Sequence, residues 1–228
     1  MQPANNLFAA YWKSRTRLPD GFVETEWLES AGSSYMDTGL KASFDDAYEW
    51  RAVQTASTSN QAIIGDGNTK TDSNFAVWVA RPGYTSAAYG VEFSFGDGGN
   101  SAYKVVASKS DCDVTEWHTY RTELATGKAR IDGALVGTAS SVSAFQNTKK
   151  LVLFGSWRGN SSNSQFRGRI SSFAAWRSGV LVRDFVPCRR TSDEMPGFYD
   201  LTGSTSPSTG TPFYTATDRS KMSVGPDV

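Results

Sequence analysis

FRGRISSFAAWRSGVLVRDFVPC, residues 166–188, is the stretch that decides the fold. Two short runs rich in Ile, Phe, Trp, Leu and Val, residues 169–176 and 180–185, flank the tripeptide Arg177-Ser178-Gly179. A Ser-Gly turn between two such runs predicts a β-hairpin. Because Pro187 has no backbone N–H to donate, we expect it to end the second strand.

The side chains of the first run alternate in character. Strand periodicity places Ile170, Ala174 and Trp176 on one face and Phe173 and Ala175 on the other. A hairpin of this length is not stable alone in water. The sequence therefore has to supply further strands and a second layer that covers the apolar face.

Further short runs of alternating or β-branched residues occur along the chain and predict more strands. They cover residues 22–28, 35–40, 47–53, 62–65, 74–80, 90–96, 102–108, 117–124, 128–131 and 151–154. Residues 155–165 read as a long polar loop, and no helical pattern or internal repeat is present. Many short strands at roughly even spacing predict a sandwich or a barrel.

Three parts of the chain carry motifs that resemble one family. The end of the chain carries Gly-Arg-Ile at 168–170, then Leu-Val-Arg-Asp-Phe-Val-Pro-Cys-Arg-Arg at 181–190 and Gly-Phe-Tyr-Asp-Leu at 197–201. The start carries Leu-Pro-Asp-Gly at 18–21, Glu-Trp-Leu-Glu-Ser at 26–30 and Tyr-Met-Asp-Thr-Gly at 35–39. Trp-His-Thr-Tyr at 117–120 leads to Ile-Asp-Gly at 131–133. Together they resemble laminin-G-like, concanavalin A-like jelly-roll proteins of gut bacteria and their phages.

This resemblance implies an all-β fold, a two-sheet antiparallel jelly-roll sandwich. We expect an N-terminal attachment arm at 1–17, the jelly-roll domain at 18–201 and a Gly/Ser/Thr/Pro-rich segment at 202–228 that folds back on the domain. Fold alone does not determine function, because this architecture serves lectins, glycanases, adhesins and virion proteins.

The overall charge argues against two classes of partner. The chain of 228 residues has 23 basic and 23 acidic side chains, which leaves no net field to attract nucleic acid or an anionic membrane. Cys112 and Cys188 are the two cysteines, and we expect reduced, buried thiols because free cysteine is often buried. No secretion signal opens the sequence, so we expect synthesis and folding in a cytoplasm.

Three carboxylates near the start offer the strongest enzyme-like pattern. Glu24, Glu26 and Glu29 have a spacing similar to the E-x-D-x-x-E motif of retaining jelly-roll glucanases, in which one carboxylate attacks and another protonates the leaving oxygen. In a regular strand, however, Glu29 would face away from Glu24 and Glu26. We therefore expect no enzyme and no catalytic residues, and interpret the carboxylates as an acidic edge that resists strand pairing.

The single histidine, His118, lies in a predicted strand beside Trp117, and we interpret it as a packed sheet residue rather than a base or ligand. Asp66, Asp97 and Asp132 each precede glycine, which is typical of turns. We expect no cofactor. The resemblance leaves calcium on Asp66 or Asp97 as an alternative, although the sequence shows no cluster of carboxylates at calcium-loop spacing.

Two segments combine aromatic, arginine and amide side chains, which is the chemistry that recognises sugars: a flat ring for the C–H face and polar groups for the hydroxyls. The candidate glycan-binding residues are Trp78, Arg81, Tyr84, Trp157, Arg158, Asn160 and Asn163. The competing interpretation is that Trp78 and Trp157 fill the ends of the sandwich.

Leu7, Phe8, Tyr11 and Trp12 form a dense apolar set ahead of the predicted domain. We expect them to bind another protein, because an uncovered apolar patch favours association. The leading hypothesis is a non-catalytic phage virion surface protein, structural or adhesive, that binds host or mucus glycans weakly and assembles in many copies with other virion proteins. It would be made in the host cytoplasm. A lectin-like module at a bacterial cell surface is the alternative, and a jelly-roll glycanase is the third.

Overall fold

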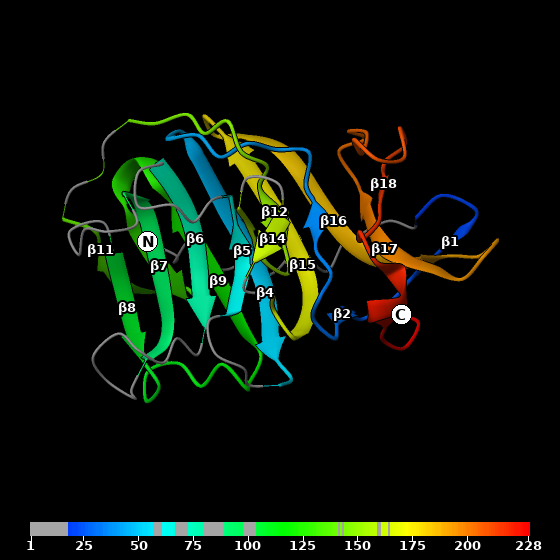
Figure 1. The fold of residues 1–228 in the computed structure, drawn as a ribbon, viewed down its shortest axis with the longest axis horizontal. Helices are drawn as coiled ribbons and strands as arrows, with labels where there is room; N and C mark the ends of the chain where they lie inside the picture. Colours follow the sequence, from blue (N-terminus) through cyan, green and yellow to red (C-terminus); the bar gives the residue numbers. More distant parts are fainter. Residues whose placement is uncertain are drawn as a thin grey trace, which may run out of the picture.

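The computed structural model describes residues 18–56, 61–66, 73–79, 89–97, 104–140, 142, 144–158, 161–163 and 165–228. Within these residues almost all regular structure is β-strand, and the helical elements are short 3-10 turns such as Leu124–Thr126 and Arg219–Lys221. Two antiparallel sheets pack face to face (Figure 1). The predicted two-sheet jelly-roll sandwich is confirmed.

The hairpin predicted from residues 166–188 forms the centre of the larger sheet. Strand β15, Gly168–Arg177, pairs with β16, Val180–Arg190, around a two-residue turn at Ser178 and Gly179. Both turn residues have positive φ, 49° and 80°, as a type I′ turn requires.

The predicted faces of β15 are partly wrong. A bulge between Ile170 and Ser172 shifts the alternation by one residue. Ile170 therefore shares the core-facing side with Phe173 and Ala175, whereas Trp176 lies outside the core.

The predicted end of the second strand at Pro187 is also wrong, because β16 continues to Arg190. The Pro187 carbonyl accepts a hydrogen bond from Thr25 N at 3.0 Å, and pairing with the next strand on that side starts only at Cys188, opposite Glu24. Proline is tolerated inside this strand because it lies where that pairing ends.

The larger sheet has the path β11-β10-β9-β4-β15-β16-β17-β18, with β1 on β16, β2 on β15 and β19 on β2. Its remaining strands are β1 Phe22–Glu24, β2 Leu28–Ser30, β4 Asp46–Gln54, β9 His118–Glu123, β10 Lys128–Ile131, β11 Ala134–Thr138, β17 Met195–Asp200, β18 Phe213–Tyr214 and β19 Met222–Val224. Residues 22–28 do not form the single strand predicted: β1 and β2 are separated by residues 25–27 and pair with different neighbours.

The smaller sheet has the order β3-β12-β5-β6-β7-β8. Its strands are β3 Met36–Asp37, β5 Gln61–Gly65, β6 Ser73–Val79, β7 Tyr89–Asp97, β8 Lys104–Ser108 and β12 Val152–Leu153. It covers the β9–β4–β15 part of the larger sheet, while β16, β17 and β18 extend beyond it (Figure 1). A separate hairpin, β13 Ser156–Arg158 and β14 Ser161–Asn163, occupies part of the segment predicted as a loop.

Aromatic side chains fill the space between the sheets. Tyr48 from β4 contacts Phe75 from β6 at 5.1 Å between ring centroids, and Trp50 stacks on Tyr120 at 5.6 Å. All four rings are fully buried. Burying one such side chain contributes roughly 1.5–3 kcal/mol, so this layer holds the two sheets together.

The C-terminal residues return to the larger sheet and add strands to it. Strand β18 pairs with β17, β19 pairs with β2, and Arg189 Nη2 binds Asp227 Oδ2 at 2.9 Å. Cys112 and Cys188 are both free and buried, and burial raises the pKa of the two thiols to about 11 and about 12. In the described part of the chain, no helix has the length and apolar character needed to cross a membrane.

Candidate functional site

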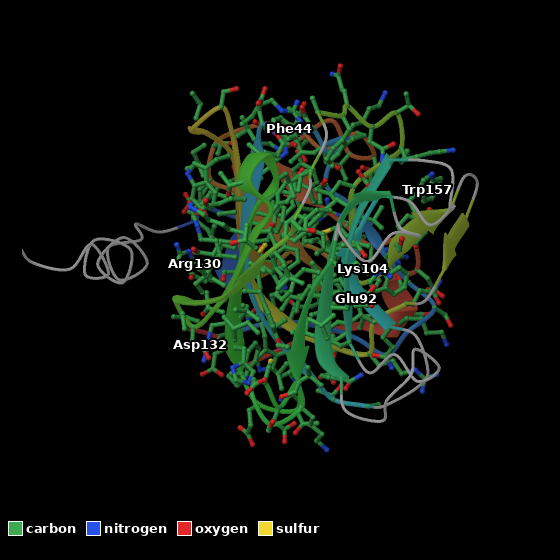
Figure 2. All side chains as sticks on the ribbon, turned by 90° about the vertical axis from the view of Figure 1, so that its left-hand side faces the viewer. Phe44, Glu92, Lys104, Arg130, Asp132 and Trp157 are labelled. Carbon is green, nitrogen blue, oxygen red and sulfur yellow. The ribbon has the colours of Figure 1, made fainter. Side chains whose placement is uncertain are left out.

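Trp157 is partly exposed on the β13–β14 hairpin. Its ring meets the ring of Tyr35 edge-on, with 5.3 Å between centroids, and Lys150 Nζ lies 5.4 Å from the Trp157 centroid. Lys150 also binds Asp37 Oδ2 at 2.9 Å. We call Tyr35, Asp37, Lys150 and Trp157 the Trp157 surface. It lies on the smaller-sheet side of the molecule, away from Arg130 and Asp132 on the larger sheet (Figure 2).

Pairing between β3 and β12 brings these residues together. Val152 lies opposite Asp37 and Leu153 opposite Met36, and Thr38 N donates to Leu151 O at 3.1 Å. Alternation on β3 sends Met36 into the core, so its neighbours Tyr35 and Asp37 face outward.

The C-terminal segment fixes the backbone of Tyr35. Thr217 N donates to Tyr35 O at 2.9 Å, and Tyr35 N donates to Thr217 Oγ1 at 3.4 Å. These hydrogen bonds at Tyr35, together with the β13–β14 pairing at Trp157, hold the two rings in contact without a ligand, which lowers the entropy cost of binding.

The surface combines two rings with three polar groups. Partial burial raises the pKa of Tyr35, which keeps its hydroxyl protonated, and the hydrogen bond with Asp37 raises the pKa of Lys150. A phenol hydroxyl, an ammonium and a carboxylate thus line one partly exposed indole ring. Such a set can stack on the C–H face of a sugar and hydrogen-bond to its hydroxyls.

Trp78 is placed differently from Trp157. It is 4% exposed on β6, packs with Ala62 and Ala76, and lies opposite Glu92, which binds Lys104 at 3.3 Å. Figure 2 shows Glu92 and Lys104 close together on the smaller sheet. Because the Trp78 ring offers almost no exposed face, we leave it out of the candidate surface.

The other predicted glycan-binding residues are described only in part. Arg158 and Asn163 lie on the paired strands of the β13–β14 hairpin, of which the backbone is described. Arg81, Tyr84 and Asn160 lie outside the described residues, as do the predicted partner-binding residues Leu7, Phe8, Tyr11 and Trp12. Sequence reasoning missed Tyr35, Asp37 and Lys150, although outward alternation in Tyr35-Met36-Asp37 was a usable signal.

His118 has a structural role in the described fold. Its Nδ1 lies 2.7 Å from Asp132 Oδ2 and its Nε2 lies 3.0 Å from the Asp113 carbonyl oxygen. Asp132 has a positive φ of 50° and also accepts from Thr119 N at 2.8 Å. The imidazole therefore ties the Asp132 turn to the start of β9, as expected for a packed sheet residue.

Asp66 is fully buried just after β5. Its Oδ1 accepts from Phe75 N at 2.7 Å, and burial raises the pKa of this carboxyl to about 8. Calcium takes six to eight oxygen ligands. Among the described residues, no three or more His, Cys, Asp or Glu side chains lie together as candidate metal ligands. Residues 67–72, which follow Asp66, and the Asp97 side chain lie outside the described part of the chain.

The three glutamates of the glucanase-like motif are held on different elements. Glu24 ends β1 opposite Cys188, Glu26 lies between strands, and Glu29 on β2 binds Arg169 Nε at 3.0 Å. A retaining glycosidase needs two carboxyl groups about 5–5.5 Å apart across the scissile bond. The ion pair that holds Glu29 favours a structural role for this residue.

We expect Glu24→Gln and Glu26→Gln to alter surface charge and nothing else. The purified wild type should release no reducing sugar from β-glucans, and neither variant should differ from it in that assay. Turnover by the wild type that either substitution abolishes would contradict this expectation.

The chain is similar to known proteins in structure rather than in sequence. No family model matches the chain, and no curated protein matches its sequence. Among solved structures, a Bacteroides ovatus protein thought to bind carbohydrate is 15% identical and has a TM-score of 0.51, over 89% of this chain and 61% of that one.

Two other solved structures are similar at lower scores. Domains LG4-5 of the mouse laminin alpha1 chain have a TM-score of 0.48 and 16% identity, over 69% of this chain and 44% of that one. The CBM40 of a Ruminococcus gnavus IT-sialidase, bound to alpha2,3 sialyllactose, has a TM-score of 0.49 and 17% identity, over 68% of this chain and 91% of its own. The chain thus spans less than two thirds of the laminin and Bacteroides chains.

The chain has the concanavalin A-like jelly-roll fold. Within that class, the solved structures to which it is similar include laminin G-like domains and carbohydrate-binding proteins. The fold follows from the two antiparallel sheets and from the likeness to the Bacteroides ovatus structure, and function has to be argued from the site.

Proposed function

We propose that this protein is a non-catalytic jelly-roll domain that binds glycans through the Trp157 surface. The observation that carries the proposal is the partly exposed Trp157 ring, held edge-on by Tyr35 and bordered by the Asp37–Lys150 ion pair. The ring supplies an apolar platform and the ion pair supplies a donor and an acceptor at its edge.

The comparisons support this proposal indirectly. The Bacteroides ovatus protein shares the fold over most of this chain and is thought to bind carbohydrate. Glu29, the third carboxylate of the glucanase-like sequence pattern, is held in an ion pair with Arg169. Both observations favour a binding role over hydrolysis.

A single site of this kind binds weakly. One aromatic platform and a few hydrogen bonds at its edge must first offset the freedom lost on association. Many copies on one particle or cell raise the apparent affinity by roughly 10² to 10⁴ through avidity. We propose a multi-copy setting on a phage particle, with a bacterial cell surface as the alternative; this part is supported by the sequence resemblance and by the apolar pattern of residues 7–12 alone.

We expect Trp157→Ala to abolish retention of the protein, displayed in many copies on beads, on surfaces coated with neutral mucin-type glycans or neutral plant polysaccharides. The variant should lose the stacking platform, while its melting temperature should fall by only a few degrees because Trp157 is partly exposed. Tyr35→Phe keeps the edge-on ring contact and should retain most binding. Bead retention and thermal unfolding are the two measurements.

Trp176→Ala is the matched control. This tryptophan is also partly exposed, but it lies outside the Trp157 surface and takes Arg121 against its ring at 5.1 Å. Its loss should leave retention unchanged. Equal retention of wild type and Trp157→Ala, or loss of retention only together with global unfolding, would overturn the proposed surface.

A further inference from the structure

Three tryptophans, one in a strand of the larger sheet and two directly before one, each carry an arginine against the ring. The distances from guanidinium carbon to ring centroid are 4.1 Å for Arg169 on Trp27, 4.8 Å for Arg51 on Trp117 and 5.1 Å for Arg121 on Trp176. None of the three rings belongs to the core, whereas the flanking residues Trp50 and Ala52 of β4 do. These contacts therefore lie on the outer face of the sheet.

A cavity of about 450 Å³ opens at one end of this face. Residues 53–56, at the end of β4 and just beyond it, line one side, and Thr115, Trp117 and Arg169 line the rest. Pairing explains the arrangement, since Arg169 lies opposite Val53 and Trp117 directly precedes β9, which pairs with β4 on its other edge. The volume falls within the usual range of small-ligand sites, about 300–1,000 Å³.

Arg169 is the one charged residue in the described lining. Its Nε donates to Glu29 at 3.0 Å and its plane lies on Trp27, so the guanidinium is fixed in place. The Arg169 side chain is 36% exposed. The described residues provide no hydrogen-bond partner for its Nη1 and Nη2 groups. A fixed guanidinium with two such donors matches a carboxylate.

The remaining lining suits a sugar ring. Trp117 provides a partly exposed indole, and Val53 provides an apolar floor. Thr55 and Thr115 contribute hydroxyls; that of Thr115 donates to Asp113 Oδ1 at 2.7 Å and so presents its lone pairs to other donors. Arg51, outside the lining, lies against the Trp117 ring with 4.8 Å between its guanidinium carbon and the ring centroid.

We propose that this cavity binds one acidic sugar residue, a uronate. Its carboxylate pairs with the Arg169 guanidinium, and its ring packs against Trp117. Glu29 already pairs with Nε of Arg169, but a neutral sugar leaves the Nη1 and Nη2 groups without a charged acceptor. A purely apolar ligand leaves these groups and the threonine hydroxyls without any hydrogen-bond partner. The site is separate from the Trp157 surface and does not depend on glycan binding there.

The test uses two ligands with the same sugar rings, one with charged carboxylates and one with neutral methyl esters. The full-length protein is titrated calorimetrically with the trisaccharide of galacturonic acid and with its fully methyl-esterified form. We expect the acid to bind about tenfold or more tightly than the ester, because a charge-assisted hydrogen bond contributes about 1.5–3 kcal/mol. Raising the salt concentration from about 0.05 to 0.5 M should weaken binding of the acid and leave binding of the ester unchanged.

Four variants locate the site. Arg169→Gln should weaken acid binding about 10- to 100-fold, and Trp117→Ala should weaken both ligands about tenfold. Arg130→Gln, on the same sheet but away from the cavity, and Trp157→Ala should bind as the wild type does. Thermal unfolding of each variant shows whether it is folded.

Equal binding of the acid and the ester by the wild type overturns the proposal, as does an absence of binding by both. Wild-type affinity in folded Trp117→Ala would also overturn it. If Arg169→Gln does not fold, Arg169→Lys takes its place, because lysine keeps the positive charge but has no planar guanidinium. If this variant then prefers the acid over the ester as strongly as the wild type does at every salt concentration, the proposal is contradicted.

Discussion

The wild-type protein should lose stability as the pH rises from about 4 to 8, and Asp66→Asn should remove most of that loss. Burial raises the folded-state pKa of Asp66 from 3.8 to about 8. Between these two values the folded chain holds a proton that the unfolded chain releases. Each pH unit in this window therefore shifts the equilibrium toward unfolding by on the order of 1 kcal/mol.

The sign follows from the proton count. The contribution of neutral Asp66 is fully present below the unfolded pKa and is lost as the pH approaches the folded value, so the total change is on the order of 5 kcal/mol. Asparagine keeps a neutral carbonyl acceptor for Phe75 N and does not titrate. Urea denaturation at pH 5, 6, 7 and 8 measures both proteins.

Asp20→Asn, at an exposed position near the start of the described chain, is the control. Its free energy of unfolding should fall with pH as steeply as that of the wild type. Burial also raises the pKa of Asp200. The stability of Asp66→Asn should therefore still fall slightly as the pH rises. A wild type whose stability is flat or rises across this pH window would show that Asp66 is ionised in the folded protein.

Local sequence patterns predicted most strands because their determinants are local. Alternation over residues 47–53 and 117–124 identified β4 and β9, and the Ser178-Gly179 turn identified the β15–β16 hairpin. The errors arose where a distant partner decides the outcome. The bulge at Ile170 and the continuation of β16 through Pro187 both depend on how neighbouring strands pair, which periodicity does not encode.

The candidate site was predictable only in part for the same reason. Trp157 and Trp78 look alike in sequence, yet one lies partly exposed on a hairpin and the other is buried on a strand. Tyr35 and Lys150 are brought beside Trp157 by pairing between β3 and β12, residues separated by more than a hundred positions. Such a cluster becomes visible only after the topology is known.

Asp46→Ala should be among the most destabilising substitutions in the described chain. The Asp46 carboxylate is buried and binds Arg177 with both oxygens, Nε to Oδ1 at 2.8 Å and Nη2 to Oδ2 at 2.9 Å. Oδ2 also accepts from Tyr48 Oη at 2.6 Å and from Ser43 N at 2.9 Å. One side chain thus connects β4, β15 and the preceding turn.

We expect Asp46→Ala to lower the free energy of unfolding by about 3 kcal/mol, which corresponds to a fall of roughly 6–12 °C in melting temperature for a domain of this size. Arg177 is 40% exposed and can turn to water, so the ion pair itself contributes little. Most of the cost arises because the fully buried Tyr48 hydroxyl and the Ser43 N–H lose their acceptor. Burial and the Asp46 carboxylate also raise the pKa of Tyr48, so its hydroxyl stays protonated and needs that acceptor.

A double variant separates the two causes. If the stranded Tyr48 hydroxyl carries the cost, Asp46→Ala combined with Tyr48→Phe should be about 1–2 kcal/mol more stable than the sum of the single variants predicts. Asp45→Ala, the exposed neighbour, should change stability by less than about 0.5 kcal/mol. Strict additivity in the double variant would contradict the hydroxyl argument, and an Asp46→Ala protein as stable as the wild type would show that this carboxylate does not hold the strands together.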